Sequence, residues 1–424
     1  MTTIGSNSSA VTAEAPSTGV DIVVGLLSHN DAGSVVAVSA AVRKALQSYD
    51  RTRNCIAWAD TGSTDDTVAR AREALAGCTV REIESATTTA DLLQVPYHGI
   101  PGKARALRAI LMTALELETR ACVVIDAGVQ TVEPHWIERL ATPVLSHDFD
   151  FVLSYYYRSP HEGALTKGLV YPLVRSLYGV RVRQPAAAEF ACSARLLRRF
   201  LDEDLWEGEG AQVGIDLWLT TCVAAGDFRV GEAALGEQTG RGEDAIDLGT
   251  TVTQVVGSLF AELGDRAERW QRMRRSVPVQ RFGEVSSVAP PPGAPVDVGR
   301  LIESYRLGYR ELRDIWTSVL PPKAIVALGK LVQGTPDAFV FPDELWARIV
   351  YDFSVGYRLR VLARDHLLRS LVPLYLGWLA SFILQTKGCS PAAVDERVER
   401  LAEVFEAQKP YLIARWRWPE PFRT

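Results

Sequence analysis

Short apolar runs alternate with segments of helical periodicity through the first half of the chain. Runs rich in Val, Ile and other apolar residues predict strands, and apolar residues at helical spacing predict the helices between them. The predicted strands cover residues 21–27, 54–59, 80–83, 121–126 and 151–157. The predicted helices cover residues 35–46, 66–75, 103–117, 165–177, 189–200 and 213–225. This alternation predicts an α/β fold with a mostly parallel, doubly wound sheet, in which ligands bind beyond the carboxyl ends of the strands.

The second half of the chain has a different pattern. Residues 276–299 contain the sequence APPPGAP and little periodicity, which predicts a Pro-rich linker or a loop that follows the surface. Helical periodicity then covers residues 300–319, 345–362, 366–384 and 390–409. We therefore expect a sheet domain at 20–275, a linker at 276–299 and a mostly helical C-terminal domain at 300–424.

Two segments bear on membranes and targeting. Residues 1–19 are rich in Ser, Thr and Ala and have no apolar core behind a basic start, which predicts a disordered tail and no secretory signal. Residues 371–384 are apolar but shorter than the roughly 20 residues that a spanning helix needs. Arg369 and Lys387 flank this run closely, so a buried helix is favoured over a membrane span.

Net charge and cysteine usage indicate which binding partners and which cellular compartment the sequence favours. The 424 residues carry a formal net charge of -5, so no excess of positive charge points to nucleic acid or to an anionic membrane. The six cysteines form no CxxC and no other metal-type spacing. This usage favours a reducing cytoplasm over a secreted disulfide scaffold.

Polar clusters follow three of the predicted strands. The sequence DTGSTDDT begins at Asp60, which could accept hydrogen bonds from a base or a ribose at a strand end. In the same segment Ser63 or Thr64 could cap the following helix, with Asp65 and Asp66 in its first turn. The segment therefore has two interpretations of equal weight, which are a nucleotide-binding loop and a plain helix start.

Four further residues lie at a helix start or a strand end, where they could contact a ligand. Lys103 follows a Pro-Gly turn at a helix start, where exposed N–H groups and a cation could hold a pyrophosphate, although a surface lysine is the commoner outcome. Asp126 ends an apolar strand and should face the ligand cleft, because a lone buried carboxylate is costly; the alternative is a strand-end turn. Glu189 and Asp216 open predicted helices and could bind a substrate, or could simply favour the helix start.

In their order along the chain these motifs resemble those of one group of retaining GT-A glycosyltransferases, the glucosyl-3-phosphoglycerate and mannosylglycerate synthases. The order is DTGSTDDT, PGK, a strand ending in Asp, SYYYR, QPxxxE and GID over residues 21–242, and residues 341–347 resemble a segment of the mannosylglycerate enzymes. The resemblance implies a Rossmann-like GT-A fold and a UDP- or GDP-sugar donor. It implies that the nucleotide sugar is bound by Leu27, Ser28, Asn30, Asp60, Ser63, Gly102, Lys103 and Asp126. It implies that the acceptor is bound by Arg158, Gln184, Ala187 and Ala188, and that Glu189 and Asp216 lie at the reaction centre.

Two departures from the family pattern concern the metal. The family has a DxD-type motif that shares a divalent cation with the donor diphosphate, but here Asp126 is followed by Ala127 and Gly128. The family's metal-binding histidine corresponds to Gly240, beside Arg241. Asp126 alone would make a weak site for Mg²⁺ or Mn²⁺. We therefore expect a metal-independent enzyme, in which Lys103 and Arg241 offset the charge of the departing diphosphate.

The leading hypothesis is a retaining hexosyltransferase with Asp126, Glu189, Asp216 and Arg241 as catalytic candidates and a small polar, anionic acceptor. The family's QPxGGE loop reads QPAAAE here, and Ala187 and Ala188 narrow the backbone choices, so acceptor choice should differ. Two alternatives stay open, which are a non-catalytic nucleotide-sugar-binding protein and a related fold with different chemistry on a nucleotide-activated substrate. The C-terminal helices would cap the acceptor site or form a homodimer interface, and their large apolar residues are Trp346, Trp378, Trp416 and Trp418, for which core packing is the commoner role.

Overall fold

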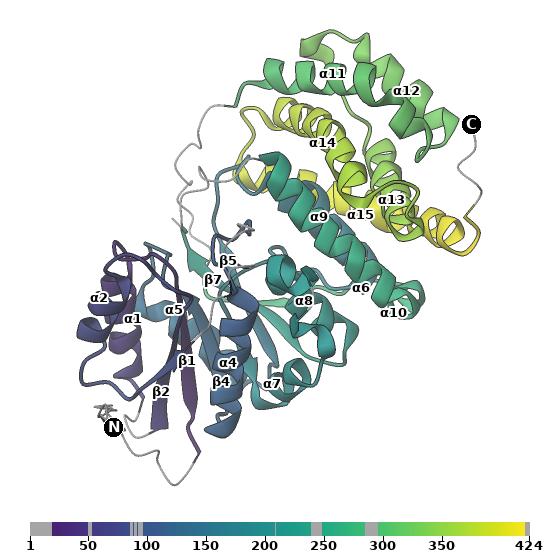
Figure 1. The fold of residues 1–424 in the computed structure, drawn as a ribbon. Coiled ribbons are helices and arrows are strands. Elements are labelled where there is room, and N and C mark those ends of the chain that lie inside the picture. The colour runs from purple at the N-terminus through teal and green to yellow at the C-terminus, as the bar shows by residue number, and fades with distance from the viewer. Residues whose placement is uncertain are drawn as a thin grey trace, which may run out of the picture.

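The computed structural model describes residues 19–49, 53–84, 88, 91, 96–207, 209–238, 248–284 and 296–419. The predicted N-terminal tail up to residue 18, the candidate Arg241 and residues 285–295 of the predicted linker lie outside this set. The described chain forms a sheet covered by helices and, next to it, a second body made of helices only (Figure 1).

An eight-stranded sheet forms the first body, with the strand order β3-β2-β1-β4-β6-β5-β7-β8. Its strands are β1 (Ile22–Ser28), β2 (Asn54–Asp60), β3 (Val80–Glu84), β4 (Ala121–Asp126), β5 (Phe151–Tyr156), β6 (Phe190–Ser193), β7 (Val230–Gly236) and β8 (Gln280–Phe282). Every pairing is parallel except those of β6, which runs antiparallel to both β4 and β5. The predicted mostly parallel α/β sheet is confirmed.

Helices cover both faces of the sheet, as a doubly wound fold requires. Alternate residues of β1 face opposite sides: Ile22, Val24 and Leu26 join one apolar core, and Val23 and Leu27 join the other. The first core takes α1 (Val35–Leu46), α2 (Thr67–Ala74) and α5 (Pro134–Ser146). The second core takes α4 (Lys103–Glu116), α7 (Ala194–Leu201) and α8 (Glu209–Ala225). Burial on both faces explains why the strands read as continuous apolar runs.

The helical body draws on more of the chain than its C-terminal part. It contains η2 (Thr166–Val170), α6 (Tyr171–Tyr178), α9 (Leu248–Asp265), α10 (Ala267–Arg272), α11 (Val298–Thr317), α12 (Pro322–Val332), α13 (Asp343–Leu359), α14 (Arg364–Thr386) and α15 (Pro391–Arg417). Residues from η2, α6, α9 and α11–α15 share one apolar core, and Figure 1 shows α6 and α9 lying among the C-terminal helices. The two bodies are therefore joined through α6 and α9.

Helix α14 contains the apolar run for which the sequence favoured a buried helix over a membrane span. Among the described residues it is the one helix long and apolar enough to cross a membrane, and 72% of its apolar window is buried inside the protein. Trp378 of α14 stacks on Trp346 of α13, and the indole N–H of Trp346 donates to the Gly168 carbonyl at 2.8 Å. Trp416 is also in the core, whereas Trp418 is 78% exposed, so the core packing expected of these tryptophans does not hold for Trp418.

Two element assignments are corrected. The helix predicted over 189–200 begins only at Ala194, because residues 190–193 form β6 between β4 and β5, and Ser193 then caps α7 by accepting the N–H of Leu196. The predicted linker at 276–299 contains strand β8, paired with β7, and its last residues already belong to α11, which Asp297 caps. Both short elements were missed because sheet pairing, not local periodicity, stabilises them.

Candidate active site

The loops after β1 and β2 hold each other through their side chains. The Asp60 carboxylate accepts hydrogen bonds from the Ser28 hydroxyl at 2.7 Å and the Ser63 hydroxyl at 2.6 Å. It also accepts the backbone N–H groups of Gly62 at 3.0 Å and Ser63 at 2.8 Å. The N–H of Asn30, a residue with a φ of 54°, donates to the Ser63 hydroxyl at 2.8 Å. Four of the sequence-predicted nucleotide residues therefore lie together at this strand edge.

The helix after this loop starts later than expected. Helix α2 begins at Thr67, and the Asp65 carboxylate accepts its N–H at 3.0 Å. Neither Ser63 nor Thr64 caps the helix, because Ser63 is bound to Asp60 and the N–H of Thr64 donates to Asn30 at 2.8 Å. The loop before α2 is thus longer than a plain helix start, since its residues 60–64 bind to each other and to the β1 loop.

Lys103 forms a buried ion pair with Asp216. It is the first residue of α4, after Gly102 with a φ of 66°, and its Nζ lies 2.6 Å from Oδ2 of Asp216 on α8. Both side chains are only 1% exposed. Two residues that the sequence placed at a phosphate subsite and at the reaction centre therefore contact each other directly. Lys103 is buried and is not the surface lysine that is the commoner outcome after a Pro-Gly turn.

Glu189 is fully buried beside Tyr156, the last residue of β5. The Tyr156 hydroxyl donates to Glu189 Oε2 at 2.5 Å. Burial, with the nearby negative charge of Asp126, raises the pKa of Glu189 to about 7. Near neutral pH this carboxyl group is therefore present in both its acid and its carboxylate form.

Asp126 joins Glu189, Asp216 and Lys103 in one electrostatic cluster. Burial raises the pKa of Asp216 above its ordinary value, Lys103 opposes this rise, and the charge of Asp126 adds to it. Within the described part of the chain, Glu189 Oε1 and Asp216 Oδ1 are buried and have no hydrogen-bond partner. Buried oxygens without partners are rare in proteins, so these two carboxylate oxygens are candidates for contact with a bound ligand.

The end of β4 also forms a turn. Asp126 is 8% exposed and its Oδ1 accepts the N–H of Gly128 at 2.7 Å. In the residues that the structure describes, no group of three or more His, Cys, Asp or Glu side chains is arranged to hold a metal ion. Asp126 therefore forms a strand-end turn, and its charge also acts on Glu189.

The residues predicted to bind the acceptor lie near the end of β5. The side-chain amide of Gln184 donates to the Tyr156 carbonyl at 2.8 Å and accepts the Tyr156 N–H at 3.2 Å. Arg158 donates to Gln238 and lies 5.9 Å from the centre of the Tyr156 ring. Among the residues described, its Nε is buried without a partner. Ala187 is buried and its N–H donates to the Gln184 carbonyl at 3.1 Å, whereas the neighbouring Ala188 is half-exposed.

Sequence reasoning missed two polar residues of this region. Tyr156 contacts both Gln184 and Glu189, and its place at the end of the FVLSYY strand was the available signal. Lys167 lies beside Arg158, and its Nζ donates to the carbonyls of Ser159 and Pro160 at 3.0 and 2.9 Å. Burial lowers the pKa of Lys167 to about 8, and no local motif predicts this environment.

Comparisons with known proteins give matches among solved structures only. No family model and no curated protein matches the chain. Glucosyl-3-phosphoglycerate synthase from Mycobacterium tuberculosis, solved with Mn²⁺, UDP and glucosyl-3-phosphoglycerate, is 26% identical over 58% of this chain and 81% of that chain, with a TM-score of 0.44. The same enzyme with Mn²⁺, UDP-glucose and glycerol 3-phosphate is 24% identical over 58% and 81%, with a TM-score of 0.43. Both matches are structures from the enzyme group that the motif order resembles, and both have TM-scores below 0.5.

Proposed function

We propose that this protein is a retaining glycosyltransferase of the GT-A type that transfers a hexose from a UDP- or GDP-sugar to a small anionic acceptor. One observation carries the proposal: Lys103, Asp126, Glu189 and Asp216, which come from four separate segments, form a buried polar cluster. Asp126 ends β4 at the carboxyl edge of the parallel sheet, which is where α/β folds bind ligands. The order of the sequence motifs supports the same assignment.

The donor would be held by two sets of residues. The loop residues Ser28, Asn30, Asp60 and Ser63 would contact the nucleoside, because they lie together where β1 and β2 end at the carboxyl edge of the sheet. Lys103 would bind the diphosphate as a charge-assisted donor. Its ammonium has three N–H groups, of which one serves Asp216. Because the side chain is 1% exposed, the residues around it would have to open before a phosphate oxygen could accept a second N–H.

The two unpartnered oxygens suit sugar hydroxyls. Lys103 stabilises the ionised form of the Asp216 carboxyl group. In that form its unpartnered Oδ1 can accept a hydrogen bond but cannot donate one. Glu189 has a pKa near 7, so at slightly acidic pH its Oε1 can donate, because the Oε2 atom accepts from Tyr156. Groups fixed in a water-excluded site need no rearrangement during the reaction, which makes their electrostatic contribution large.

The residues present do not fit a divalent metal ion. Mg²⁺ takes six oxygen ligands in a near-octahedral arrangement. In the part of the chain that the structure describes, no three His, Cys, Asp or Glu side chains are arranged to hold a metal ion, and position 128 carries no carboxylate. We therefore assign no step to a metal and propose that Lys103, with Arg241, supplies the positive charge that the departing diphosphate needs.

The acceptor would meet Arg158 and the QPAAAE loop. Arg158 has a buried Nε without a partner in the described chain, and Lys167 adds a second cation nearby. Two cations beside each other favour a carboxylate or a phosphate group on the acceptor. Ala187 and Ala188 would then restrict the space beside the reacting sugar.

The test is a transfer assay with the full chain, UDP-glucose or GDP-mannose as donor and 3-phosphoglycerate, glycerol 3-phosphate and glycerate as acceptors. Mass spectrometry should detect a hexosylated product, and NMR of its anomeric proton should show that the configuration is retained. Asp216→Asn should lower turnover strongly, whereas the distant variant Arg397→Gln should keep it. Failure of both donors to bind would contradict the proposal.

A second candidate is a nucleotide-sugar-binding protein without catalysis. The observation that favours it is the pairing of Lys103 with Asp216, because it partly neutralises the charge that a leaving diphosphate requires. Saturable donor binding with neither transfer nor donor hydrolysis, in the presence and absence of Mn²⁺, would select this candidate over the enzyme.

A further inference from the structure

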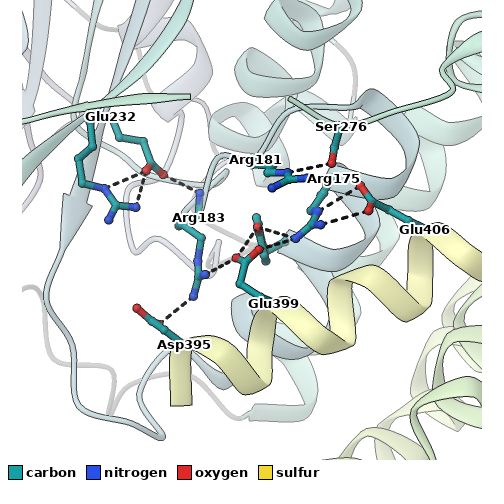
Figure 2. A network of polar contacts seen from close by, with 10 residues as sticks. Arg175, Arg181, Arg183, Glu232, Ser276, Asp395, Glu399 and Glu406 are labelled. Carbon is teal, nitrogen blue, oxygen red and sulfur yellow. Dashed lines mark hydrogen bonds and ion pairs between the residues drawn. The ribbon is translucent and has the colours of Figure 1, made fainter. Parts of the chain in front are cut away.

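Arg183 connects the segment before the QPAAAE loop to helix α15. Its guanidinium contacts Glu399 and lies 2.9 Å from Asp395, both on α15, and Figure 2 shows it between this helix and the sheet. Its backbone N–H donates to Glu232 of β7 at 2.6 Å. The residue is therefore held from two sides immediately before residues 184–189 begin.

Glu399 is the anchor of this contact on the helical side. It accepts the hydroxyl of Tyr171 at 2.7 Å and contacts Arg175, a side chain that is 1% exposed. Arg175 in turn binds Glu406 through two hydrogen bonds of 3.1 Å (Figure 2). Burial would raise the pKa of Glu399, but the Tyr171 hydrogen bond and the charges of Arg183 and Arg175 hold it below its ordinary value, so Glu399 stays ionised at neutral pH.

Arg183 itself is well enclosed. Its side chain is 13% exposed, and its guanidinium carbon lies 4.8 Å from the centre of the Tyr171 ring. Asp395 is 49% exposed, and an ion pair with so exposed a partner contributes little. Glu399, which is shared among two arginines and a tyrosine, is the partner that determines where the guanidinium lies.

The contacts continue from Arg183 into the candidate site. Gln184 follows directly, and its amide fixes the backbone of Tyr156 through two hydrogen bonds. The Tyr156 hydroxyl then donates to Glu189, at the other end of the same loop. A shift of Arg183 would therefore reach Glu189 through Gln184 and Tyr156.

We propose that Arg183 is a positioning residue, through which Glu399 of helix α15 sets the geometry of residues 184–189 and hence of Glu189. The inference rests on the proposed function for its kinetic consequence, but its structural part can be measured without any substrate. It gives the C-terminal helices a role in the reaction centre: they orient the loop that faces the sugar.

The experiment compares Arg183→Gln, Arg183→Lys and Glu399→Gln with the matched control Arg397→Gln. Arg397 is also on α15, is 10% exposed and pairs with Asp343 of α13 at 2.7 Å, within the helical body. The first measurement is hydrogen exchange in the full chain. The Tyr156 and Ala187 amides, which depend on Gln184, should exchange at least about tenfold faster in Arg183→Gln and Glu399→Gln, and at the wild-type rate in Arg397→Gln.

The second measurement is the pH profile of sugar transfer. A misplacement of about 1 Å at a reaction centre costs up to about 100-fold in rate, so kcat should fall 10- to 100-fold in Arg183→Gln with a smaller change in KM for the donor. The limb of the pH profile that reflects ionisation of Glu189 should shift to a different pH. Arg183→Lys should restore part of kcat and part of the wild-type pH profile. Arg397→Gln should show neither effect, even if it unfolds more easily.

Unchanged exchange at Tyr156 and Ala187 in Arg183→Gln would overturn the positioning role, and so would an equal change in Arg397→Gln. Faster exchange together with wild-type kcat and pH profile would also overturn it. If the wild-type protein transfers no sugar, the proposed function fails, while the exchange data still decide whether Arg183 orders the loop.

Discussion

The substitution Glu189→Gln should make the protein more stable at alkaline pH and leave its stability nearly unchanged at acidic pH. Burial, with the charge of Asp126, raises the pKa of Glu189 from 4.5 to about 7 in the folded protein. Between these two pH values the folded state binds the proton more tightly than the unfolded state. The stability that protonated Glu189 contributes is therefore fully present below pH 4.5 and is lost as the pH rises through about 7.

The magnitude follows from the two pKa values. At 1.36 kcal/mol per pH unit, the difference between 4.5 and about 7 amounts to roughly 3 kcal/mol. Gln keeps the shape of Glu and can still accept the Tyr156 hydroxyl, but it cannot ionise. The stability of Glu189→Gln relative to wild type should therefore rise by roughly 3 kcal/mol between pH 4.5 and about pH 7 and then level off.

The assay is urea unfolding, followed by tryptophan fluorescence, of both proteins across this pH range. Other buried carboxyl groups titrate in both proteins and largely cancel in the comparison. A difference in stability that stays constant with pH would refute the reasoning, because Glu189 would then titrate alike in the folded and unfolded chains.

Three further outcomes are expected. Lys103→Met should lower the free energy of unfolding by about 3–5 kcal/mol, measured in urea, because Asp216 would stay buried without its cation; a loss below about 1 kcal/mol would contradict a dry ion pair. Gly168→Ala should destabilise the helical body by at least about 1–3 kcal/mol, since the new Cβ would lie 2.0 Å from ring atoms of Trp378, and an unchanged melting temperature would argue against this packing. Transfer activity should persist in excess EDTA, because Asp126 has no companion carboxylate at position 128, and a strict dependence on Mn²⁺ would overturn the metal-independent proposal.

The sequence was most informative where a local pattern and a sheet edge coincide. Asp60 and Asp126 each follow an apolar run, so their places at the ends of β2 and β4 could be predicted. The α/β class followed from the same alternation. Strand β6 could not be predicted, because its four residues are stabilised by pairing with β4 and β5 and run directly into a helix.

The contacts of the candidate site were beyond local patterns. Lys103 and Asp216 are separated by 113 positions, and each has an ordinary explanation as a helix-start residue. Their pairing exists only because α4 and α8 pack on the same face of the sheet. In the same way Glu189 was a sound candidate, but its perturbed pKa depends on burial beside Tyr156 and Asp126, which no spacing in the sequence specifies.

We propose above all that the carboxyl edge of this sheet binds a nucleotide diphosphate through Lys103. Isothermal titration of UDP and GDP into the full chain, with Arg397→Gln as the folded control, tests it directly. We expect one saturable site per chain in both proteins for one of the two nucleotides. Loss of the charge-assisted hydrogen bond, worth about 1.5–3 kcal/mol, should weaken binding about 10- to 100-fold in Lys103→Met. Binding of neither nucleotide by the folded wild-type protein would contradict this site, and so would a folded Lys103→Met variant that binds the nucleotide as tightly as wild type.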